Sequence, residues 1–368
     1  MVEGAPDSPW AVDAYHELDL AHSLEVFGED MTISAERTRE FLSSQDSGLH
    51  VLLLAIGATA APSRPGRFGL PLAPDSPVEV HGVALLTLPT ADNQHLVDDL
   101  FVMVAADGRR RGVATALLDQ VRRIARESGR DTILAWSEHR TTPASAELPQ
   151  LAPPTGTGSV PIDGNVGFLR AAGFELVQVE RMSRLELPTP AGLLERLAAQ
   201  AEEAAGASYR VVSWLGEVPE PYLEPVAALY AAMSTDAPQG GIDFREEKWD
   251  AERVRRHDRE LLQSGELVQT LALSRDDGRA AGHTVMFVPV ASPHRPEQHN
   301  TVVLAAHRGH RLGLWIKAAN LALLEEEFPR ARHIDTWNAD ENSHMLAINT
   351  AIGYRQLGVT GAWQLRLT

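Results

Sequence analysis

The hydrophobic positions of this chain form the same composite pattern once in each half. An apolar run rich in β-branched residues, Leu100–Val104 or Thr301–Leu304, is followed by a turn that begins at Arg109 or Arg308. Runs of this composition favour β-strands. After each turn, apolar residues recur at helical spacing until a glycine or a proline ends the repeat. We therefore predict a strand, a basic turn and an amphipathic helix in each half.

The same periodicities predict the surrounding elements. Helices are predicted near residues 11–26, 193–205, 222–233 and 248–262. Strands are predicted near residues 51–56, 80–88, 132–136, 184–187, 209–212, 267–273, 283–290 and 333–337.

Each basic turn has the composition of an anion site. The first reads Arg109-Arg110-Arg111-Gly112-Val113-Ala114, and the second reads Arg308-Gly309-His310-Arg311-Leu312-Gly313. A small residue at the start of a helix lets an anion approach the free backbone N–H groups and the positive end of the helix dipole. Arginines add charge-assisted hydrogen bonds. Both turns are therefore predicted to hold a phosphate group.

A second landmark supports a duplication. Downstream of each turn, a short helical segment ends in a glycine and an aromatic residue, Gly173-Phe174 and Gly353-Tyr354. Gly173 follows Arg109 by 64 residues, whereas Gly353 follows Arg308 by 45. The difference corresponds to a proline- and threonine-rich insertion at about 139–158. We interpret it as a solvated loop in preference to a lid over a substrate.

Length and composition agree with two domains. The chain has 368 residues, of which 44% are hydrophobic, and this length exceeds the usual size of a single core. We predict an N-terminal domain at 1–187, a linker and helix at 188–208, and a C-terminal domain at 209–368.

Charge and residue usage exclude several classes of function. The formal net charge of −17 argues against nucleic acid as a partner, and no apolar run is long enough to predict a membrane span. The chain has no cysteine, which excludes disulfides and thiolate catalysis, and its 14 histidines form no metal-binding pair. We expect a cytoplasmic protein without a metal, as a monomer or a homodimer.

The first turn resembles a known signature. Arg109-x-x-Gly112-x-Ala114 is similar to the (Gln/Arg)-x-x-Gly-x-(Gly/Ala) motif of the GNAT superfamily of acyl-CoA-dependent N-acyltransferases. The segments 308–314 and 337–342 resemble the second half of the mycothiol synthase group of actinobacterial tandem acyltransferases. The resemblance implies a bacterial protein of the α+β or α/β class. It implies two tandem GNAT-like domains, each a mixed, mostly antiparallel sheet flanked by helices.

The resemblance also implies acetyl-CoA as the co-substrate and a set of residues that hold it. These are the ends of the two strands, the two turns and the starts of the helices that follow, with two asparagines near the last helix. The set comprises Val102, Met103, Val104, Arg109, Arg110, Arg111, Gly112, Val113, Ala114, Thr115, Val303, Leu304, Arg308, Gly309, His310, Arg311, Leu312, Gly313, Leu314, Asn338 and Asn342.

Acyl transfer to an amine requires a base, and family members often place a carboxylate next to the first of these strands. Asp98 and Asp99 stand there in the first half, and Asp99 precedes Arg109 by ten residues. An ordinary strand entry with both carboxylates in water explains the pair equally well. Glu138 and His139 are lesser candidates. In the second half the position ten residues before Arg308 is Gln298, which cannot act as a base.

The sequence departs from the family pattern in ways that leave its activity open. Many members carry a tyrosine four residues before the glycine of the last helix, where this chain has Leu169 and Asn349. Arg311 replaces the first glycine of the second turn. We predict an N-acetyltransferase that moves the acetyl group directly from acetyl-CoA to a primary amine of a small molecule. The alternatives are a degenerate, non-catalytic acyl-CoA-binding or sensing module and an interaction scaffold. The polar groups that could line an acceptor pocket in the second half are Asp236, His283, Asp340, Glu341 and His344.

Overall fold

The computed structural model describes residues 1–4, 8–44, 48–57, 64–236 and 238–367, which form two compact units. The first unit contains residues 1–179 and 359–368, and the second contains residues 180–358. The last strand of the chain therefore ends in the first unit. The two units divide after residue 179, whereas the sequence predicts a linker at 188–208. That linker remains a prediction about where the two domains can be separated.

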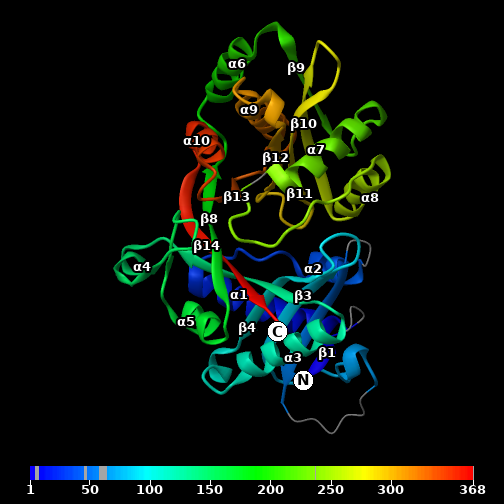
Figure 1. The fold of residues 1–368 in the computed structure, drawn as a ribbon, viewed down its shortest axis with the longest axis vertical. Coiled ribbons are helices and arrows are strands. Elements are labelled where there is room, and N and C mark those ends of the chain that lie inside the picture. Colours follow the sequence, from blue (N-terminus) through cyan, green and yellow to red (C-terminus); the bar gives the residue numbers. More distant parts are fainter. Residues whose placement is uncertain (5–7, 45–47, 58–63, 237, 368) are drawn as a thin grey trace. The chain divides into compact units, whose positions relative to one another are not determined.

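The first unit is a sheet with helices on both faces (Figure 1). Its strands follow the order β1 (Val2–Gly4), β2 (Gly48–Ile56), β3 (Val80–Pro89), β4 (Leu96–Val104), β5 (Thr132–Arg140), β14 (Arg355–Arg366) and β8 (Glu175–Glu186), of which the last two strands belong only in part to this unit. Its helices are α1 (Pro9–Phe27), α2 (Ala35–Ser43), α3 (Val113–Glu127), α4 (Pro143–Glu147) and α5 (Gly164–Ala171).

The second unit repeats this plan. Its strands follow the order β8, β13 (His333–Ala339), β12 (Glu297–Val303), β11 (Ala280–Pro289), β10 (Gly265–Ser274) and β9 (Tyr209–Leu215). Its helices are α6 (Leu193–Ala205), α7 (Leu223–Asp236), α8 (Ala251–Leu261), α9 (Leu312–Glu327) and α10 (Ser343–Ile352). In Figure 1 the α9 helix crosses the strands, and α7 and α8 lie side by side.

Each unit combines a parallel strand pair with antiparallel pairs. β4 pairs with β5 in parallel, and β12 pairs with β13 in parallel, whereas the neighbouring pairs β3–β4 and β11–β12 are antiparallel. The mixed, mostly antiparallel sheets flanked by helices that the sequence predicts are confirmed. The predicted helices and strands of both halves are present as well, with boundaries shifted by a few residues.

The two faces of the first sheet carry different helices. Apolar residues of α1 and α2, including Tyr15 and Leu42, pack with Leu52 and Met103 on one face. Residues of α3, including Leu117 and Val121, pack with Leu53 and Ala84 on the opposite face. Side chains of β4 and β5 that point to the α1 face therefore have different neighbours from those that point to the α3 face.

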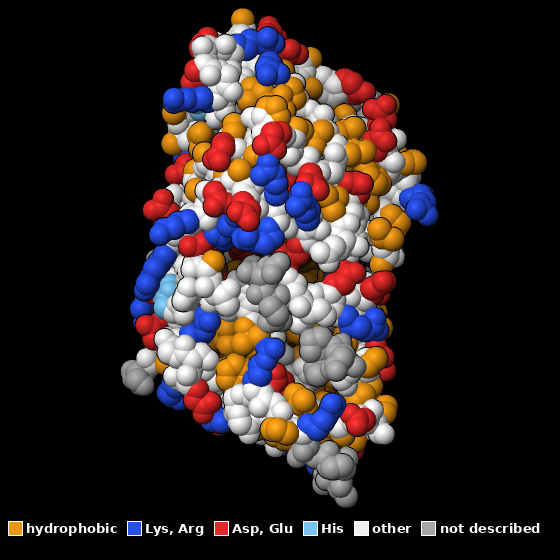
Figure 2. Space-filling model, turned by 90° about the vertical axis from the view of Figure 1, so that its right-hand side faces the viewer, with side chains coloured by type: hydrophobic (Ala, Val, Ile, Leu, Met, Phe, Trp, Pro, Cys, Tyr) orange, Lys and Arg blue, Asp and Glu red, His pale blue; other side chains and the backbone are white. Residues whose placement is uncertain are grey.

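Within the described ranges, the chain has no helix with the length and apolar character that spanning a bilayer requires. On the face that Figure 2 shows, acidic and basic side chains lie interspersed. The insertion at 139–158 has regular structure: it contains the exposed helix α4, and its strand β6 (Gln150–Leu151) pairs with β7 (Val160–Pro161). The Thr142 side chain caps α4 by accepting the Ser145 N–H.

Candidate functional site

The two parallel strands of the first unit separate beyond a short paired region. β4 and β5 pair at Leu96 with Thr132, at Val97 with Ile133 and at Leu100 with Ala135. Both strands continue, to Val104 and Arg140, with no further pairing among the described residues. The β4 edge that faces β5 is therefore open along Val102–Val104, the part of the strand expected to bind the co-substrate.

A β-bulge marks the point where the strands separate. Residues 99 and 100 of β4 face the single residue 86 of β3, and Asp99 has a left-handed backbone with φ of 49°. Bulges bend a strand and re-aim its side chains. Asp98 lies one residue earlier, and its Oδ1 accepts the Asp99 N–H at 2.9 Å.

The second unit repeats both features. β12 and β13 pair only at Glu297 with Asp335 among the described residues, and residues 299 and 300 of β12 face the single residue Val285. The first bulge residue, which corresponds to Asp99, is thus His299. Counting ten residues back from Arg308 pointed to Gln298 instead. The two positions differ because the bulge lies one residue nearer to the turn in β12 than in β4. Gln298 is buried and donates to the Val285 carbonyl at 2.8 Å.

The first basic turn ends in an open helix N-terminus. Gly112 has φ of 83° and precedes α3, and a Cβ built on it meets no atom within 4 Å. The first hydrogen bond of the helix runs from the Ala116 N–H to the Gly112 carbonyl. The N–H groups of Val113, Ala114 and Thr115 therefore precede the helical ladder and are directed toward the turn.

The second turn has left-handed residues at the same two positions as the first, but its glycine and arginine are in the opposite order. Arg110 and Gly112 are left-handed in the first turn, with φ of 62° and 83°, and Gly309 and Arg311 are left-handed in the second, with φ of 87° and 54°. Arg311 is exposed and precedes α9. Leu312, Gly313 and Leu314 form the buried start of that helix. A Cβ on Gly313 would lie 3.0 Å from the end of the Ile348 side chain, so a larger residue here would press against α10.

The first arginine of each turn is held in the same way. The Arg109 guanidinium donates to both carboxylate oxygens of Glu25 on α1, at 2.8 and 2.5 Å, and to the Val104 carbonyl at 3.4 Å. Arg308 donates to Asp236 at the end of α7, at 2.9 Å, and to the Val303 carbonyl at 3.2 Å. These two arginines fasten each turn to the preceding strand. Arg110 and Arg111 in the first turn, and His310 and Arg311 in the second, are exposed.

The face of β4 and β5 that packs with α1 carries a group of titratable side chains. Glu138 lies 3.6 Å from His22, and that contact raises the pKa of His22. Burial, and then the charge of Glu138, raise the pKa of Asp19 to about 6. Burial also raises the pKa of Asp99, which the nearby Trp136 indole opposes. Asp99 is accessible to solvent even so. The sequence analysis missed Asp19 and His22, since a helix with polar residues at these positions looks like an ordinary solvated face.

The polar residues predicted for the second unit have other partners. His283 is fully buried and bonds to Gln269 at 3.0 Å, and burial lowers its pKa to about 3. Asp340 accepts from Arg181 at 2.6 Å. Asn342 caps α10 by accepting the Met345 N–H, and Asn338 accepts from Asn349 at 2.7 Å.

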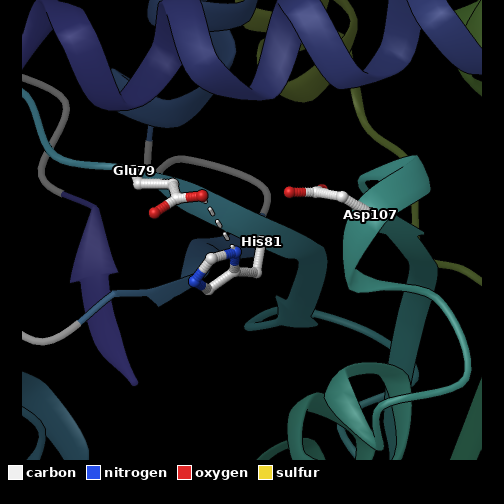
Figure 3. Close-up of side chains that lie close together, drawn as sticks. All are labelled: Glu79, His81 and Asp107. Atoms are coloured by element: carbon white, nitrogen blue, oxygen red, sulfur yellow. Dashed lines mark ion pairs between the residues drawn. The ribbon is translucent and has the colours of Figure 1, made fainter.

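Three residues of the first unit have the donor types of a metal site. Figure 3 shows Glu79, His81 and Asp107, whose possible ligand atoms lie within 4.8 Å of one another. His81 Nδ1 is 3.8 Å from the Glu79 carboxylate. Both carboxylates belong to exposed residues, and such groups commonly lie together without an ion. The cluster has no role in the chemistry proposed below.

Comparisons with known proteins place the fold. None of the known protein-family models matches the sequence, and no curated protein matches it. A solved tandem GNAT protein from the clavulanic acid biosynthesis pathway, without acetyl-CoA, is 22% identical with a TM-score of 0.69, over 99% of this chain and 97% of that one. A GCN5-related N-acetyltransferase from Sphaerobacter thermophilus is 14% identical with a TM-score of 0.58, over 99% of this chain and 94% of that one. A glucosamine N-acetyltransferase region of a fungal multi-domain GH3 beta-N-acetylglucosaminidase is 14% identical with a TM-score of 0.55, over 96% of this chain and 37% of that one. The chain therefore has the tandem GNAT fold.

Proposed function

We propose that this protein is an N-acyltransferase that moves an acetyl group from acetyl-CoA to the primary amine of a small molecule, and that the first unit carries the reaction. The observation that carries the proposal is the separation of β4 from β5 between an open helix N-terminus and a carboxylate at a bulge. Acyl transfer needs an anion site for the donor, polarisation of the thioester and a base for the amine. The first unit offers one group for each task.

The donor is held by backbone groups. The coenzyme diphosphate accepts hydrogen bonds from the N–H groups between Arg110 and Thr115, with Arg110 and Arg111 supplying positive charge. The thioester lies along the open edge of β4, where main-chain N–H groups of Val102–Val104 polarise its carbonyl. The side chains of β4 are not needed for this step, which is why apolar residues serve there.

The acceptor is an amine that approaches from the α1 face. Asp99, Asp19 and Glu138 give this face negative charge, which favours an ammonium group. A carboxylate then removes a proton from the bound ammonium, and the neutral amine attacks the thioester carbon. The C–N bond forms as the C–S bond breaks. Asp99 is the proposed base because it lies at the bulge, where the paired strands end, and Glu138 is the second choice.

The second unit is proposed to retain a coenzyme site with altered chemistry. Arg311 occupies the position of Gly112, and its guanidinium can pair with a diphosphate where close backbone approach is lost. His299 is the titratable group at the second bulge, and Glu297 lies 3.6 Å from it. The first unit is preferred because its turn is open at Gly112 and its bulge carries a carboxylate.

Thiol release from acetyl-CoA tests this proposal. The full-length protein is incubated with acetyl-CoA and spermidine, glucosamine or kanamycin, and the free thiol and the acetylated amine are measured together. We expect amine-dependent thiol release with equimolar product for at least one acceptor class. Asp99→Asn and His299→Asn then report which unit works: loss in the first variant supports the proposal, and loss only in the second assigns the reaction to the second unit. Binding of acetyl-CoA without turnover of any amine supports a non-catalytic binding module instead.

A further inference from the structure

Three side chains of the first unit form a continuous hydrogen-bonded row beside the separated strands. His139 Nδ1 lies 3.0 Å from the Asp163 carboxylate, and His139 Nε2 lies 2.9 Å from Ser137 Oγ. The Trp363 indole N–H donates to the same Ser137 oxygen at 2.9 Å. Ser137, His139 and Trp363 are buried. The row connects a hydroxyl to a carboxylate through an imidazole.

The row lies on the face of β5 opposite the titratable group described above. Ala135 packs in the core with α3, and Ser137 and His139 follow it at two-residue intervals on the same face of the strand. Trp136 and Glu138 point to the α1 face. Ser137 is also the second residue beyond Ala135, the last β5 residue that pairs with β4. Ser137 therefore lies in register just beyond the paired region, on the same side as α3, and its hydroxyl contacts Trp363 of β14, the other neighbour of β5.

This position matters because the proposed reaction releases a thiolate that needs a proton. The last helix of the first unit has Leu169 where an acid would be expected, and a leucine cannot donate. The proton therefore comes either from solvent or from a side chain of another element. Ser137 carries a hydroxyl two residues beyond the last β5 residue that pairs with β4.

We propose that Ser137 donates its hydroxyl proton to the departing coenzyme A thiolate while His139, held by Asp163, returns a proton to Ser137. The inference rests on the function proposed above. The C–S bond breaks with its electron pair on sulfur, the sulfur takes the Ser137 proton, and the imidazolium gives its Nε2 proton to the serine oxygen. The neutral imidazole regains a proton from solvent, which has received the proton of the amine. Ser137 is the catalytic residue, and His139 and Asp163 act through it.

The surroundings of the row hold a carboxylate against the imidazole. Burial raises the pKa of Asp163, but hydrogen bonds from His139 and from the N–H groups of Val166 and Asn165 outweigh it and hold the pKa below its ordinary value. These N–H groups belong to the first turn of α5, so the helix start fixes the carboxylate. With a proton on Nε2, Ser137 Oγ accepts from both His139 and Trp363. Its own proton is then the one it can donate.

Among the described residues of the second unit, the matching positions form no such row. Trp136 and Trp337 occupy matching places on β5 and β13, so that Asn338 and Asp340 stand where Ser137 and His139 stand. Asn338 accepts from Asn349, and Asp340 accepts from Arg181. Neither is a proton donor at neutral pH. The difference agrees with a reaction carried by the first unit.

Steady-state kinetics of the full-length protein test the row. We expect Ser137→Ala and His139→Gln each to lower kcat for thiol release at least tenfold, with KM for acetyl-CoA changed less than twofold. Glutamine retains a donor and an acceptor but cannot ionise, so a purely structural imidazole would be replaced with little loss of kcat. Thr270→Val, which removes a buried hydroxyl bonded to Asn320 at 2.8 Å in the second unit, is the matched control and should retain kcat.

A rescue experiment keeps the inference testable if one substitution perturbs the fold. His139→Gly leaves space for an imidazole, and added imidazole should restore kcat at least fivefold while leaving His139→Gln unaffected. If the wild-type protein turns over and both Ser137→Ala and His139→Gln keep its kcat, the proposed role of the row is wrong and the proposed function still stands. Absence of wild-type turnover overturns the proposed function and this inference with it.

Discussion

Gly112→Asn tests whether coenzyme binding depends on the open backbone of the first turn. Gly112 has φ of 83°, and a Cβ there meets no atom within 4 Å, so the substitution creates no clash within the protein. Its side chain would instead occupy the space in front of the free N–H groups of α3. Asparagine is chosen because it tolerates left-handed backbone, whereas a β-branched residue such as valine would be strained whatever it binds.

Gly129 provides the matched control at the other end of the same helix. It has φ of 68°, and a Cβ there also meets no atom within 4 Å. A side chain in left-handed backbone costs about 1–2 kcal/mol, and asparagine lies at the low end of that range. We therefore expect Gly112→Asn and Gly129→Asn each to lower the unfolding free energy by about 1 kcal/mol, or Tm by about 2–4 °C for a unit of this size.

Only one of the two substitutions should affect the coenzyme. Each charge-assisted hydrogen bond to the diphosphate contributes about 1.5–3 kcal/mol, so loss of one weakens binding at least tenfold. Isothermal calorimetry with acetyl-CoA, combined with thermal unfolding of the same samples, measures both quantities. Equal affinity in Gly112→Asn and Gly129→Asn, with equal losses of Tm, would refute an anion site at this turn.

Three further changes have defined outcomes. Asp99→Asn should lower kcat on the order of a hundredfold while acetyl-CoA affinity is kept, as steady-state kinetics and calorimetry would show. Arg311→Ala in a Gly112→Asn background should weaken acetyl-CoA binding, as calorimetry would show, whereas stronger binding would mean that Arg311 blocks the second turn. Burial lowers the pKa of Lys317 to about 7. The unfolded chain keeps this proton up to about pH 10.4, so the unfolding free energy should rise between about pH 7 and 10.4. Lys317→Met should remove that slope in urea titrations and stabilise the protein most below pH 7; an unchanged slope would contradict a neutral buried lysine.

Local patterns of sequence were enough to predict the elements that position the site. The apolar repeat after Gly112 corresponds to one buried face of α3, and the strand-like run before it corresponds to β4. The missed helix α2 is different. Its apolar core contacts come from the adjacent Phe41 and Leu42, and most of its other residues are polar, so the segment shows no helical repeat of apolar residues. Its start is fixed by the Ser34 side chain, which accepts the Arg37 N–H.

Long-range contacts could not be predicted from these patterns. Glu25 is 84 residues from Arg109 in the sequence, and Asp236 is 72 residues from Arg308, yet each carboxylate fastens its turn. The position of His299 depends on a bulge, which changes strand register without changing the spacing of hydrophobic residues. The row from Ser137 to Asp163 forms only when the N-cap residue of α5, Asp163, lies next to His139 of β5. These side chains come together only in the folded chain, so their spacing in the sequence does not predict the contacts.

A structure with bound acetyl-CoA tests the central claim most directly. The account predicts the diphosphate on the N–H groups between Arg110 and Thr115, and the thioester in the gap between β4 and β5, with its sulfur near Ser137 and its carbonyl carbon accessible from the side of Asp99. Coenzyme bound only at the turn from Arg308 to Gly313, or bound at the first turn with its thioester outside that gap, would contradict it.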